Sequence, residues 1–502
     1  MPDPGTVTLV GAGPGDPLLI TLAGVEALRS ADAIVYDKLV PVRLLDWAPN
    51  AERHFVGKQA GHLYTPQAEI NQLLVRLAKE GKRVVRLKGG DPLIFARGSE
   101  EMETLADAKV PFEIIPGVTA ALGAAATAAI PLTHRGHASL VTFVTGHDDP
   151  EKSSNNVDWK GLAKHPGTLV IYMARTKLAN IAQELLAGGM DPSTPFAFIQ
   201  WGGSNRQRVV TSTLAKSVAG APAEIGTPMI AIVGPLVDYR EQLQWLEKKP
   251  LFGRTILLLR APEQNETLAR RLEHLGAEVI VEPVFHIEPP ATWDAVDQVI
   301  DQIRSFDWLV FSSRNGVRHF FDRLLARGKD VRAIGHVSIA AIGPGTGDEL
   351  KQFSLRADLI PNEHRAEGLA EQLLSRVKGK AVLLVRADRG RTVLEDQLGP
   401  VARDVQTVVT YRQVDVTAPS RETLDRLRKG EITDVLLTSS NIARGFVGWL
   451  DEETRNIVRQ RAQIVSISPV TSGVVRDLGF DVAREAAVYT MDGIVEVLVG
   501  RS

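Results

Sequence analysis

Three short loops rich in glycine and proline follow apolar, β-branched runs in the first half of the chain. They span residues 11–17, 89–92 and 116–120. Glycine permits tight turns and lets the backbone approach a ligand closely, so such loops suit a ligand that is bound by main-chain groups. Together the three loops predict an enclosed site, lined by backbone, for a small polar cofactor.

The first of these loops superficially matches a dinucleotide-binding fingerprint, with Asp37 about 20 residues further on as the acid for a ribose. We reject this interpretation. The third glycine, Gly15, comes one position too early, and Pro14 and Pro17 remove amide donors that a pyrophosphate requires. A nicotinamide-dependent oxidoreductase with an unusual glycine loop stays an alternative that titration with cofactors would separate.

The second half of the chain contains an internal repeat. Residues 253–260 resemble 379–386, residues 311–315 resemble 437–441, and residues 342–346 resemble 467–471, all at offsets of about 126 residues. Each match places small polar residues after an apolar strand and before a helix. Ligands bind at this edge of parallel sheets because helix N-terminal amides point toward it, and such amides suit carboxylates. The repeat therefore predicts two similar α/β lobes with a cleft between them.

The elements that must position these loops alternate between apolar runs and amphipathic helical patterns, which is typical of α/β architecture. A polar segment at residues 239–250 separates two regions. The strand-like runs are residues 7–10, 34–36, 84–87, 140–145, 168–172, 256–259, 309–311 and 382–385.

Composition excludes several classes of protein. The chain has 502 residues, 58 Lys+Arg against 60 Asp+Glu, and no cysteine. The near-neutral charge argues against a nucleic-acid binder with a generally basic surface. Without cysteine there is no disulfide, thiolate metal site or Cys nucleophile, and we expect no metal. The N-terminus lacks the pattern of a signal peptide, and the apolar stretch 118–132 is too short to span a bilayer, so we expect a cytoplasmic protein.

The first region resembles the uroporphyrinogen-III C-methyltransferases of the tetrapyrrole methyltransferase family. The matching elements are VGAGPGDP, VYDKLV, GKQAGH, RLKGGDP, PGVTAA, PLTHRG, VTGH and YMA, in order, over residues 5–240. The resemblance implies a two-lobed fold, a homodimer formed through this half, and S-adenosylmethionine as methyl donor. It implies cofactor contacts at Pro14, Gly89, Gly90, Asp91, Ile94, Thr119, Ala120, Met173 and Gly202.

The same resemblance assigns catalytic roles. Asp37 stands in the family's position for a proton acceptor, and Lys58 in that for a proton donor. Read without the family, they are a helix-flanking carboxylate and a surface ammonium, and Asp91 is equally a residue that caps its loop. The substrate is rich in carboxylates, with which four cationic side chains could pair: Arg97, His134, Arg135 and Arg175.

The region 252–502 resembles the uroporphyrinogen-III synthases, which cyclise hydroxymethylbilane without a cofactor. The similar segments include FSSRNGV, AAIGPGTGDEL, VVTYRQV, LTSSNIARGF and SISPVTSG. The resemblance implies one lobe from residues 252–286 and 416–502 and a second from residues 291–412, joined by a two-stranded ladder. Residues 1–245 would form the methyltransferase and residues 246–251 a linker.

Within the synthase-like region, Tyr411 matches the family's tyrosine and would protonate or orient the leaving hydroxyl, although an aromatic side chain packed at a strand end is the other interpretation. Thr346 and Thr471 are family-like hydroxyls that could also cap helices. Weaker candidates for substrate binding are Ser313, Arg314, Ser439 and Ser440, and positive charge could come from Arg254, Arg260 and Arg386.

We therefore predict a fused enzyme that makes uroporphyrinogen III in one half and methylates it twice to precorrin-2 in the other. The two activities form a coherent pair because the product of one is the substrate of the other. The alternative keeps the methyltransferase and makes the second half a non-catalytic ligand-binding module. We expect small tetrapyrroles as substrates and neither nucleic acid nor membrane as a partner.

Overall fold

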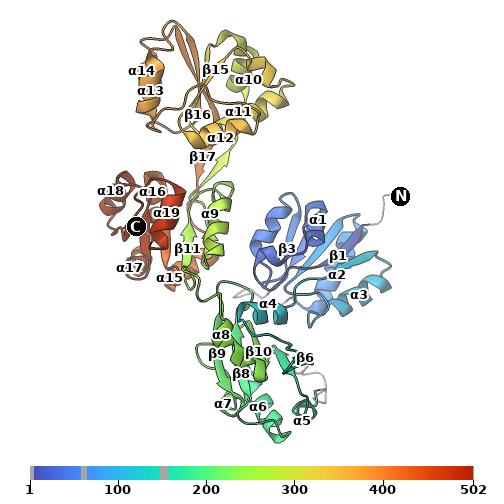
Figure 1. Cartoon of the computed structure of the whole chain (residues 1–502). Helices are drawn as coiled ribbons and strands as arrows, with labels where there is room; N and C mark the ends of the chain where they lie inside the picture. Colours follow the sequence, from blue (N-terminus) through green and yellow to red (C-terminus); the bar gives the residue numbers. More distant parts are fainter. Residues whose placement is uncertain (1–4, 58–64, 147–156, 501–502) are drawn as a thin grey trace. The chain divides into compact units, whose positions relative to one another are not determined.

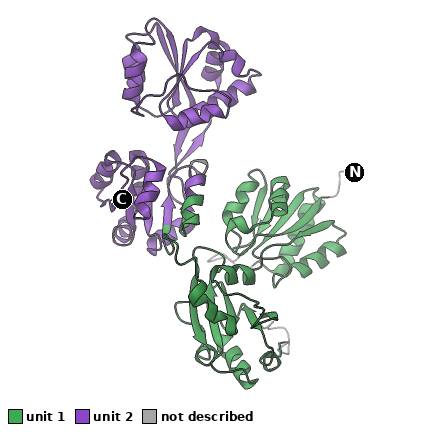
Figure 2. Ribbon diagram, in the orientation of Figure 1, with its two compact units in different colours: residues 1–255, 270–279 green, residues 256–269, 280–502 purple. Residues whose placement is uncertain are grey.

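The computed structural model describes residues 5–57, 65–146 and 157–500, without the side chains of residues 262–264. Two compact units are distinguished (Figure 2): residues 1–255 with 270–279, and residues 256–269 with 280–502. Four five-stranded sheets form the framework, each flanked by helices (Figure 1). The α/β class predicted from the alternating runs is confirmed.

The first sheet has the order β3-β2-β4-β1-β5 and is parallel throughout. Because all its strands run the same way, the loops after β1, β2, β4 and β5 emerge at one edge. The strands are β1 (Thr6–Gly11), β2 (Ala33–Tyr36), β3 (Glu52–Phe55), β4 (Arg83–Lys88) and β5 (Phe112–Ile115). The helices are η1 (Pro17–Leu19), α1 (Leu22–Ser30), η2 (Val42–Trp47), α2 (Gln67–Lys79) and α3 (Gly98–Asp107).

Both faces of this sheet are covered, which explains why its strands β1 and β2 are mostly apolar. On one face Val7 and Leu9 pack with residues of α2 and α3. On the other face Val10 packs with Leu28 of α1 and with Leu44 of η2. The two cores hold the strands from both faces, so the loops at the strand ends are the parts that the cores do not fix.

The second sheet is mixed, with the order β6-β7-β10-β8-β9. Only β6 and β7 pair in parallel, and the remaining pairs are antiparallel. The strands are β6 (Val141–Thr145), β7 (Thr168–Tyr172), β8 (Pro195–Gln200), β9 (Arg208–Thr213) and β10 (Met229–Val233). The helices are α4 (Ala120–Thr127), α5 (Trp159–Leu162), α6 (Leu178–Ala187), α7 (Leu214–Ser217), η3 (Pro235–Tyr239) and α8 (Arg240–Leu243).

Helix α4 packs against this second sheet through alanines. Ala121, Ala124 and Ala125 are buried in one core with Val170 of β7 and Ile199 of β8. Such small side chains let a helix approach a sheet closely. The Ala-rich stretch of the sequence is therefore a packed helix of the second lobe.

The third sheet, β12-β11-β18-β19-β20, is built from two separate stretches of the chain. Its strands are β11 (Thr255–Leu258), β12 (Glu278–Val281), β18 (Asp434–Leu437), β19 (Gln463–Ser466) and β20 (Arg484–Glu485). The helices are α9 (Pro262–His274), α15 (Arg421–Arg428), α16 (Ser440–Gly448), α17 (Glu452–Arg461), α18 (Pro469–Asp477) and α19 (Met491–Leu498).

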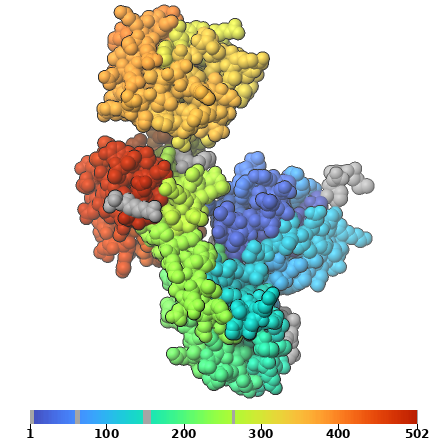
Figure 3. All heavy atoms as spheres, in the orientation of Figure 1, coloured from blue at the N-terminus to red at the C-terminus, as the bar shows by residue number. Residues whose placement is uncertain are grey.

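The fourth sheet, β13-β17-β16-β14-β15, belongs to a lobe whose atoms, yellow to orange, form one closely packed body (Figure 3). Its strands are β13 (Phe285–Glu288), β14 (Trp308–Phe311), β15 (Ser338–Ala341), β16 (Ala381–Ala387) and β17 (Asp404–Asp415). The helices are α10 (Asp294–Asp301), η4 (Ile303–Ser305), α11 (Arg314–Ala326), η5 (Val331–Ile334), α12 (Pro344–Lys351), α13 (Ala366–Leu374) and α14 (Val393–Leu398).

The internal repeat corresponds to equal strand order in these two sheets. The repeated segments supply the neighbouring strands β11-β18-β19 in one sheet and β16-β14-β15 in the other. Along the chain, however, β11 precedes its neighbours whereas β16 follows them. The two lobes thus have the same spatial order of equivalent strands, but these strands follow one another in a different order along the chain.

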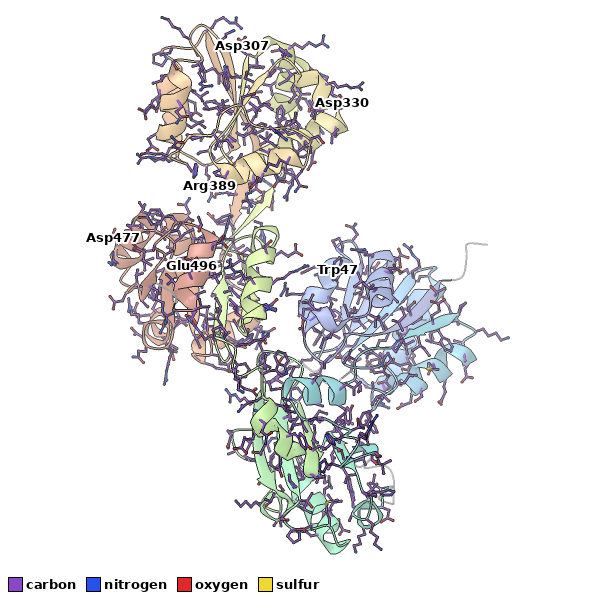
Figure 4. The ribbon with its side chains drawn as sticks, viewed as in Figure 1. Trp47, Asp307, Asp330, Arg389, Asp477 and Glu496 are labelled. Atoms are coloured by element: carbon purple, nitrogen blue, oxygen red, sulfur yellow. The ribbon has the colours of Figure 1, made fainter. Side chains whose placement is uncertain are left out.

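A two-stranded antiparallel ladder of β13 and the end of β17 pairs Phe285 with Asp415 and Glu288 with Arg412. Arg412 also makes an ion pair with Glu288 at 2.7 Å. Arg389, labelled in Figure 4, pairs with Asp415 at 2.7 Å. A two-stranded ladder of this kind is what the resemblance to the uroporphyrinogen-III synthases implied for the connection between the lobes.

In the part of the chain that the structure describes, no helix is long and apolar enough to cross a membrane.

A surface ion pair between the starts of β2 and β4 leads to a test of the fold. Hydrogen bonds from the side chain and backbone of Arg83 lower the pKa of Asp32 to about 2. A carboxyl with a depressed folded pKa stabilises the fold above its unfolded pKa, and this stabilisation is lost as pH falls through the folded value. We expect Asp32→Asn to lower the free energy of unfolding at pH 7 by at most about 1 kcal/mol, because the pair is exposed.

The difference between Asp32→Asn and the unmodified chain should shrink to about half near pH 3, which lies between the two pKa values. Urea denaturation from pH 7 to pH 3 measures it. A difference that stays constant over this range would show that the carboxylate does not contribute through its charge.

Candidate functional sites

The three glycine loops meet at the carboxyl edge of the first sheet. Gly13 and Gly90 form an antiparallel bridge in which each amide donates to the carbonyl of the other, at 3.2 and 2.8 Å. A Cβ at Gly117 would lie 2.4 Å from the Gly90 carbonyl oxygen, and one at Gly11 would lie 2.5 Å from the Gly117 Cα. Only glycine fits these contacts, so the loops pack main chain against main chain. The three loops therefore form a cradle of main chain, and binding of a cofactor in it stays a prediction.

Asp91 holds two of the loops together. One carboxylate oxygen accepts a hydrogen bond from Leu93 N–H at 2.8 Å, and the other accepts one from Gly117 N–H at 3.0 Å. This is the loop-capping interpretation considered from the sequence. A direct contact of Asp91 with a cofactor stays a prediction.

Tyr172, which the sequence analysis did not single out, ties the second lobe to the loop at residues 116–120. Its hydroxyl lies 2.7 Å from Thr119 Oγ1 and accepts a hydrogen bond from Ala121 N–H at 3.0 Å. Burial raises the pKa of Tyr172. Its ring contacts Phe95, with 4.9 Å between centroids. Its neighbour Met173, a predicted cofactor contact, is half exposed.

Pro14 and Gly202 lie where the first loop meets the second lobe. A Cβ at Gly123 or at Gly203 would lie 2.3 or 2.7 Å from Pro14 Cγ, and one at Gly202 would lie 2.5 Å from the Ala124 Cβ. Pro14 therefore fits between α4 and the loop after β8. The signal for this contact in the sequence was the small residues that face Pro14 from both sides, Gly123 in α4 and Gly203 in the loop after β8.

The remaining predicted cofactor contacts lie on the same edge or in the core beside it. Gly89 precedes the bridge residue Gly90, and its Cβ would lie 2.9 Å from that of Leu39. Ile94 and Ala120 are partly buried against the core that contains Tyr172. The structure thus brings together loops that are separated by up to about two hundred residues in the chain, because strand ends meet at this edge.

Asp37 directly follows β2, and β2 is the neighbour of β4 in the sheet. Its side chain is 30% exposed, and its Oδ2 lies 3.7 Å from Nη2 of the buried Arg86. Its other oxygen accepts a hydrogen bond from Leu39 N–H at 3.0 Å. The predicted partner Lys58 lies outside the described residues. Arg86 was missed from the sequence because a charged residue inside a strand usually marks an exposed face.

The four predicted substrate-binding cations are partly or fully accessible. Arg97 precedes α3 with φ of 58° and donates two hydrogen bonds to Glu100, at 2.8 and 2.6 Å. The ring of His134 contacts those of His137 and Tyr239. Arg135 is exposed and Arg175 is partly buried. Their pairing with substrate carboxylates stays a prediction.

In the second unit, Tyr411 is buried at the end region of β17 and donates a hydrogen bond to Ser313 Oγ at 2.9 Å. Burial raises the pKa of Tyr411. The His319 ring stacks on it, with 5.7 Å between centroids, and burial lowers the pKa of His319. The ring of Tyr411 is therefore packed, as one interpretation of the sequence expected, and its hydroxyl also has a polar partner.

The repeated hydroxyl residues have different structural roles. Ser313 and Ser439 cap α11 and α16, each accepting a hydrogen bond from a backbone amide of the first turn. Thr346 and Thr471 are buried inside the first turns of α12 and α18, whose capping positions are held by Gly343 and Ser468. The capping alternative for the two threonines is therefore wrong, because both come three residues too late.

Two arginines provide positive charge beyond strand ends of the synthase-like unit, Arg260 after β11 and Arg314 after β14. Arg314 lies against the first turn of α12, where a Cβ at Gly345 would be 2.4 Å from its Nη2. Burial, and then the charge of Arg314, lower the pKa of the Arg260 guanidinium. Two guanidiniums that repel each other beside a helix N-terminus form an environment that favours an anion.

Among the described residues, no group of three or more His, Cys, Asp or Glu side chains could hold a metal ion.

Two family models match the chain. Tetrapyrrole (Corrin/Porphyrin) Methylases matches residues 6–218, and Uroporphyrinogen-III synthase HemD matches residues 266–496. Porphyrin biosynthesis protein HemD of Ruminiclostridium josui is 33% identical over 506 residues, 98% of each chain.

Shorter stretches match further relatives. Uroporphyrinogen-III C-methyltransferase of Bacillus subtilis (strain 168) is 39% identical over 364 residues, 72% of this chain and 74% of that one. Siroheme synthase 2 of Serratia proteamaculans (strain 568) is 49% identical over 246 residues, and the chain spans 52% of its length. The Thermus thermophilus uroporphyrin-III C-methyl transferase structure, complexed with S-adenyl homocysteine, is 39% identical, with a TM-score of 0.41 over 46% of this chain and 93% of that one.

The chain therefore belongs to the tetrapyrrole methylases in its N-terminal half and to the uroporphyrinogen-III synthases in its C-terminal half. It is a fused enzyme of tetrapyrrole biosynthesis, as the sequence motifs predicted.

Proposed function

We propose that the C-terminal half cyclises hydroxymethylbilane to uroporphyrinogen III and that the N-terminal half methylates this product twice to precorrin-2. The observation that carries the proposal is the presence of both families in one chain, matched along 98% of its length by a single relative. The chemistry of the two halves is sequential. Siroheme biosynthesis is the pathway that the names of several relatives suggest.

The methyl donor is proposed to be S-adenosylmethionine, which when bound supplies an electrophilic methyl group. The glycine cradle supports this, since Gly11 and Gly117 bring main chain against main chain where no side chain fits, and such loops suit a ligand that is bound by backbone groups. Around it, the predicted contacts Pro14, Thr119 and Met173 would hold the cofactor. We propose no cofactor for the synthase half.

Asp37 is proposed to take the proton that a substrate ring must release as its carbon is methylated. A partly exposed carboxylate at the edge of the cradle can reach a substrate, and Arg86 and Leu39 N–H hold it in place. Such a positioned base typically contributes about a hundredfold or more to the rate. Lys58 is the proposed proton donor by resemblance alone.

In the synthase half, Tyr411 is proposed to donate a hydrogen bond to the hydroxyl that leaves hydroxymethylbilane. Because burial raises its pKa, the phenol stays neutral and keeps its proton available. Arg260 and Arg314, with the first turns of α11, α12, α16 and α18, would bind substrate carboxylates. Ser313, Thr346, Ser439 and Thr471 line these turns.

Several further properties are proposed on resemblance. They are a homodimer formed through the methyltransferase half, a cytoplasmic location, and division of the chain into residues 1–245, a linker at 246–251 and residues 252–502.

The full-length protein, incubated with hydroxymethylbilane and S-adenosylmethionine, should yield the doubly methylated product, identified by mass analysis. Omission of the methyl donor should stop the reaction at uroporphyrinogen III. If only the spontaneous isomer, uroporphyrinogen I, accumulates, the second half is a binding module and its proposed activity is refuted. Absence of methylation of supplied uroporphyrinogen III would refute the activity of the first half.

Asp37→Asn should lower the turnover of methylation about a hundredfold or more, because the amide cannot accept the proton. Cofactor affinity should change little, since the cradle is built from other loops. Turnover is measured with uroporphyrinogen III as substrate and binding by calorimetry with S-adenosylhomocysteine. Asp107→Asn on α3 serves as a control for the loss of one charge, and equal turnover in both variants would remove Asp37 from this role.

Tyr411→Phe should slow cyclisation about tenfold or more and raise the share of uroporphyrinogen I, because the hydroxyl can no longer assist departure. Loss of its hydrogen bond to Ser313 should cost only about 1 kcal/mol of stability. Tyr489→Phe, at an exposed position, is the matched control. If both variants cyclise at the rate of the unmodified chain, Tyr411 has a packing role alone.

A further inference from the structure

Beneath Asp37 the first lobe contains a cluster of buried charges, of which the proposed mechanism uses only Arg86. It consists of Arg86 and Lys88 on β4 and Glu101 in the first turn of α3, here called the Glu101 cluster. Arg86 and Lys88 are each 3% exposed, and Glu101 is fully buried. Arg86 and Lys88 are two positions apart on a strand, so both point to the same face of the sheet.

A single oxygen of Glu101 holds the cluster together. Its Oε1 accepts hydrogen bonds from Arg86 Nε at 3.1 Å, Lys88 Nζ at 2.8 Å and Gln67 Nε2 at 3.1 Å. Its Oε2 is buried without a hydrogen-bond partner among the described residues. Buried charges are costly unless they are paired and hydrogen-bonded. A carboxylate with three donors on one oxygen and none on the other therefore indicates a role beyond stability.

Two cations share one carboxylate, which leaves positive charge uncompensated in the Glu101 cluster. Asp37 faces this charge, through Arg86 Nη2 at 3.7 Å and through its electrostatic attraction to Lys88. Arg86 is fixed further because its Nη1 donates to the carbonyls of Val35 and Leu87, at 3.3 and 3.2 Å. The loop of Asp37 itself contributes Leu39 N–H and the exposed Lys38.

We propose that Glu101 is a positioning residue for methyl transfer. It holds the Arg86 guanidinium facing Asp37 and, together with Lys88, sets how much positive charge that carboxylate faces. The inference rests on the proposed role of Asp37 as proton acceptor. If the Glu101 cluster had only a structural role, changes to its charges would alter stability. They would not shift the pH profile of methylation in a direction set by the sign of the charge that is removed.

The test uses charge balance in the full-length protein. Glu101→Gln removes a negative charge and should move the acidic limb of the pH profile of methylation kcat/KM to lower pH, by about one pH unit. Lys88→Met removes a positive charge and should move the limb to higher pH. The double variant with both changes restores the charge sum of the cluster and should return the limb to its original position.

Glu103→Gln is the matched control, because it is the same substitution at an exposed position of the same helix. Binding of S-adenosylhomocysteine within about twofold of the unmodified chain verifies that each variant keeps its cofactor site. If Glu101→Gln does not fold, its acidic limb cannot be measured. The comparison of Lys88→Met with the double variant then decides, because the inference requires the acidic limbs of these two variants to lie at different pH.

Limbs that coincide in Lys88→Met, the double variant and the unmodified chain would overturn the inference, as would shifts of the two single variants in the same direction. An unmodified chain that does not methylate uroporphyrinogen III would refute the proposed function, and this inference with it. Unshifted limbs in an active enzyme would refute this inference alone.

Discussion

Contact between main chains at the edge of the first sheet is the constraint on which the methyltransferase half depends. A Cβ at Gly11 or Gly117 would clash with main-chain atoms of a neighbouring loop, and Gly90 has a φ of 71°, which favours glycine, so the three loops close on each other through peptide groups. Asp91 fastens the loops at residues 89–92 and 116–120 to each other, and Tyr172 fastens the latter loop to the second lobe. A cradle made of backbone can be rigid without being lined by bulky side chains, which suits a compact polar ligand.

Charge is distributed locally in this protein. The chain is nearly neutral overall, with 58 basic and 60 acidic residues. Yet Arg86 and Lys88 are buried behind Asp37, and Arg260 and Arg314 repel each other in the synthase-like unit. Electrostatic interactions are much stronger in such poorly solvated places than at a surface. An anionic substrate therefore requires a few well-placed cations and helix amides, and not a basic protein.

The synthase-like unit reuses one structural solution in two lobes. Apolar strands β14 and β18 are each followed, two residues later, by a serine that caps the next helix. Because the capping hydroxyl and the free amides of the first turn lie at the same strand edge, each lobe presents polar groups in the same way. Tyr411 makes its lobe different, since its hydroxyl bonds to one of these caps, Ser313.

The sequence by itself determined the α/β class, the repeat, the families of both halves and the loops of the cradle, because these depend on local patterns of apolar, glycine and polar residues. It did not reveal the antiparallel strands of the second sheet, since strand direction depends on how distant segments pair. It also missed Tyr172 and Glu101, whose roles arise from partners 53 and 15 residues away. Only the tertiary structure decided these, because burial and pairing of a polar side chain are properties of its surroundings, and not of its position in the chain.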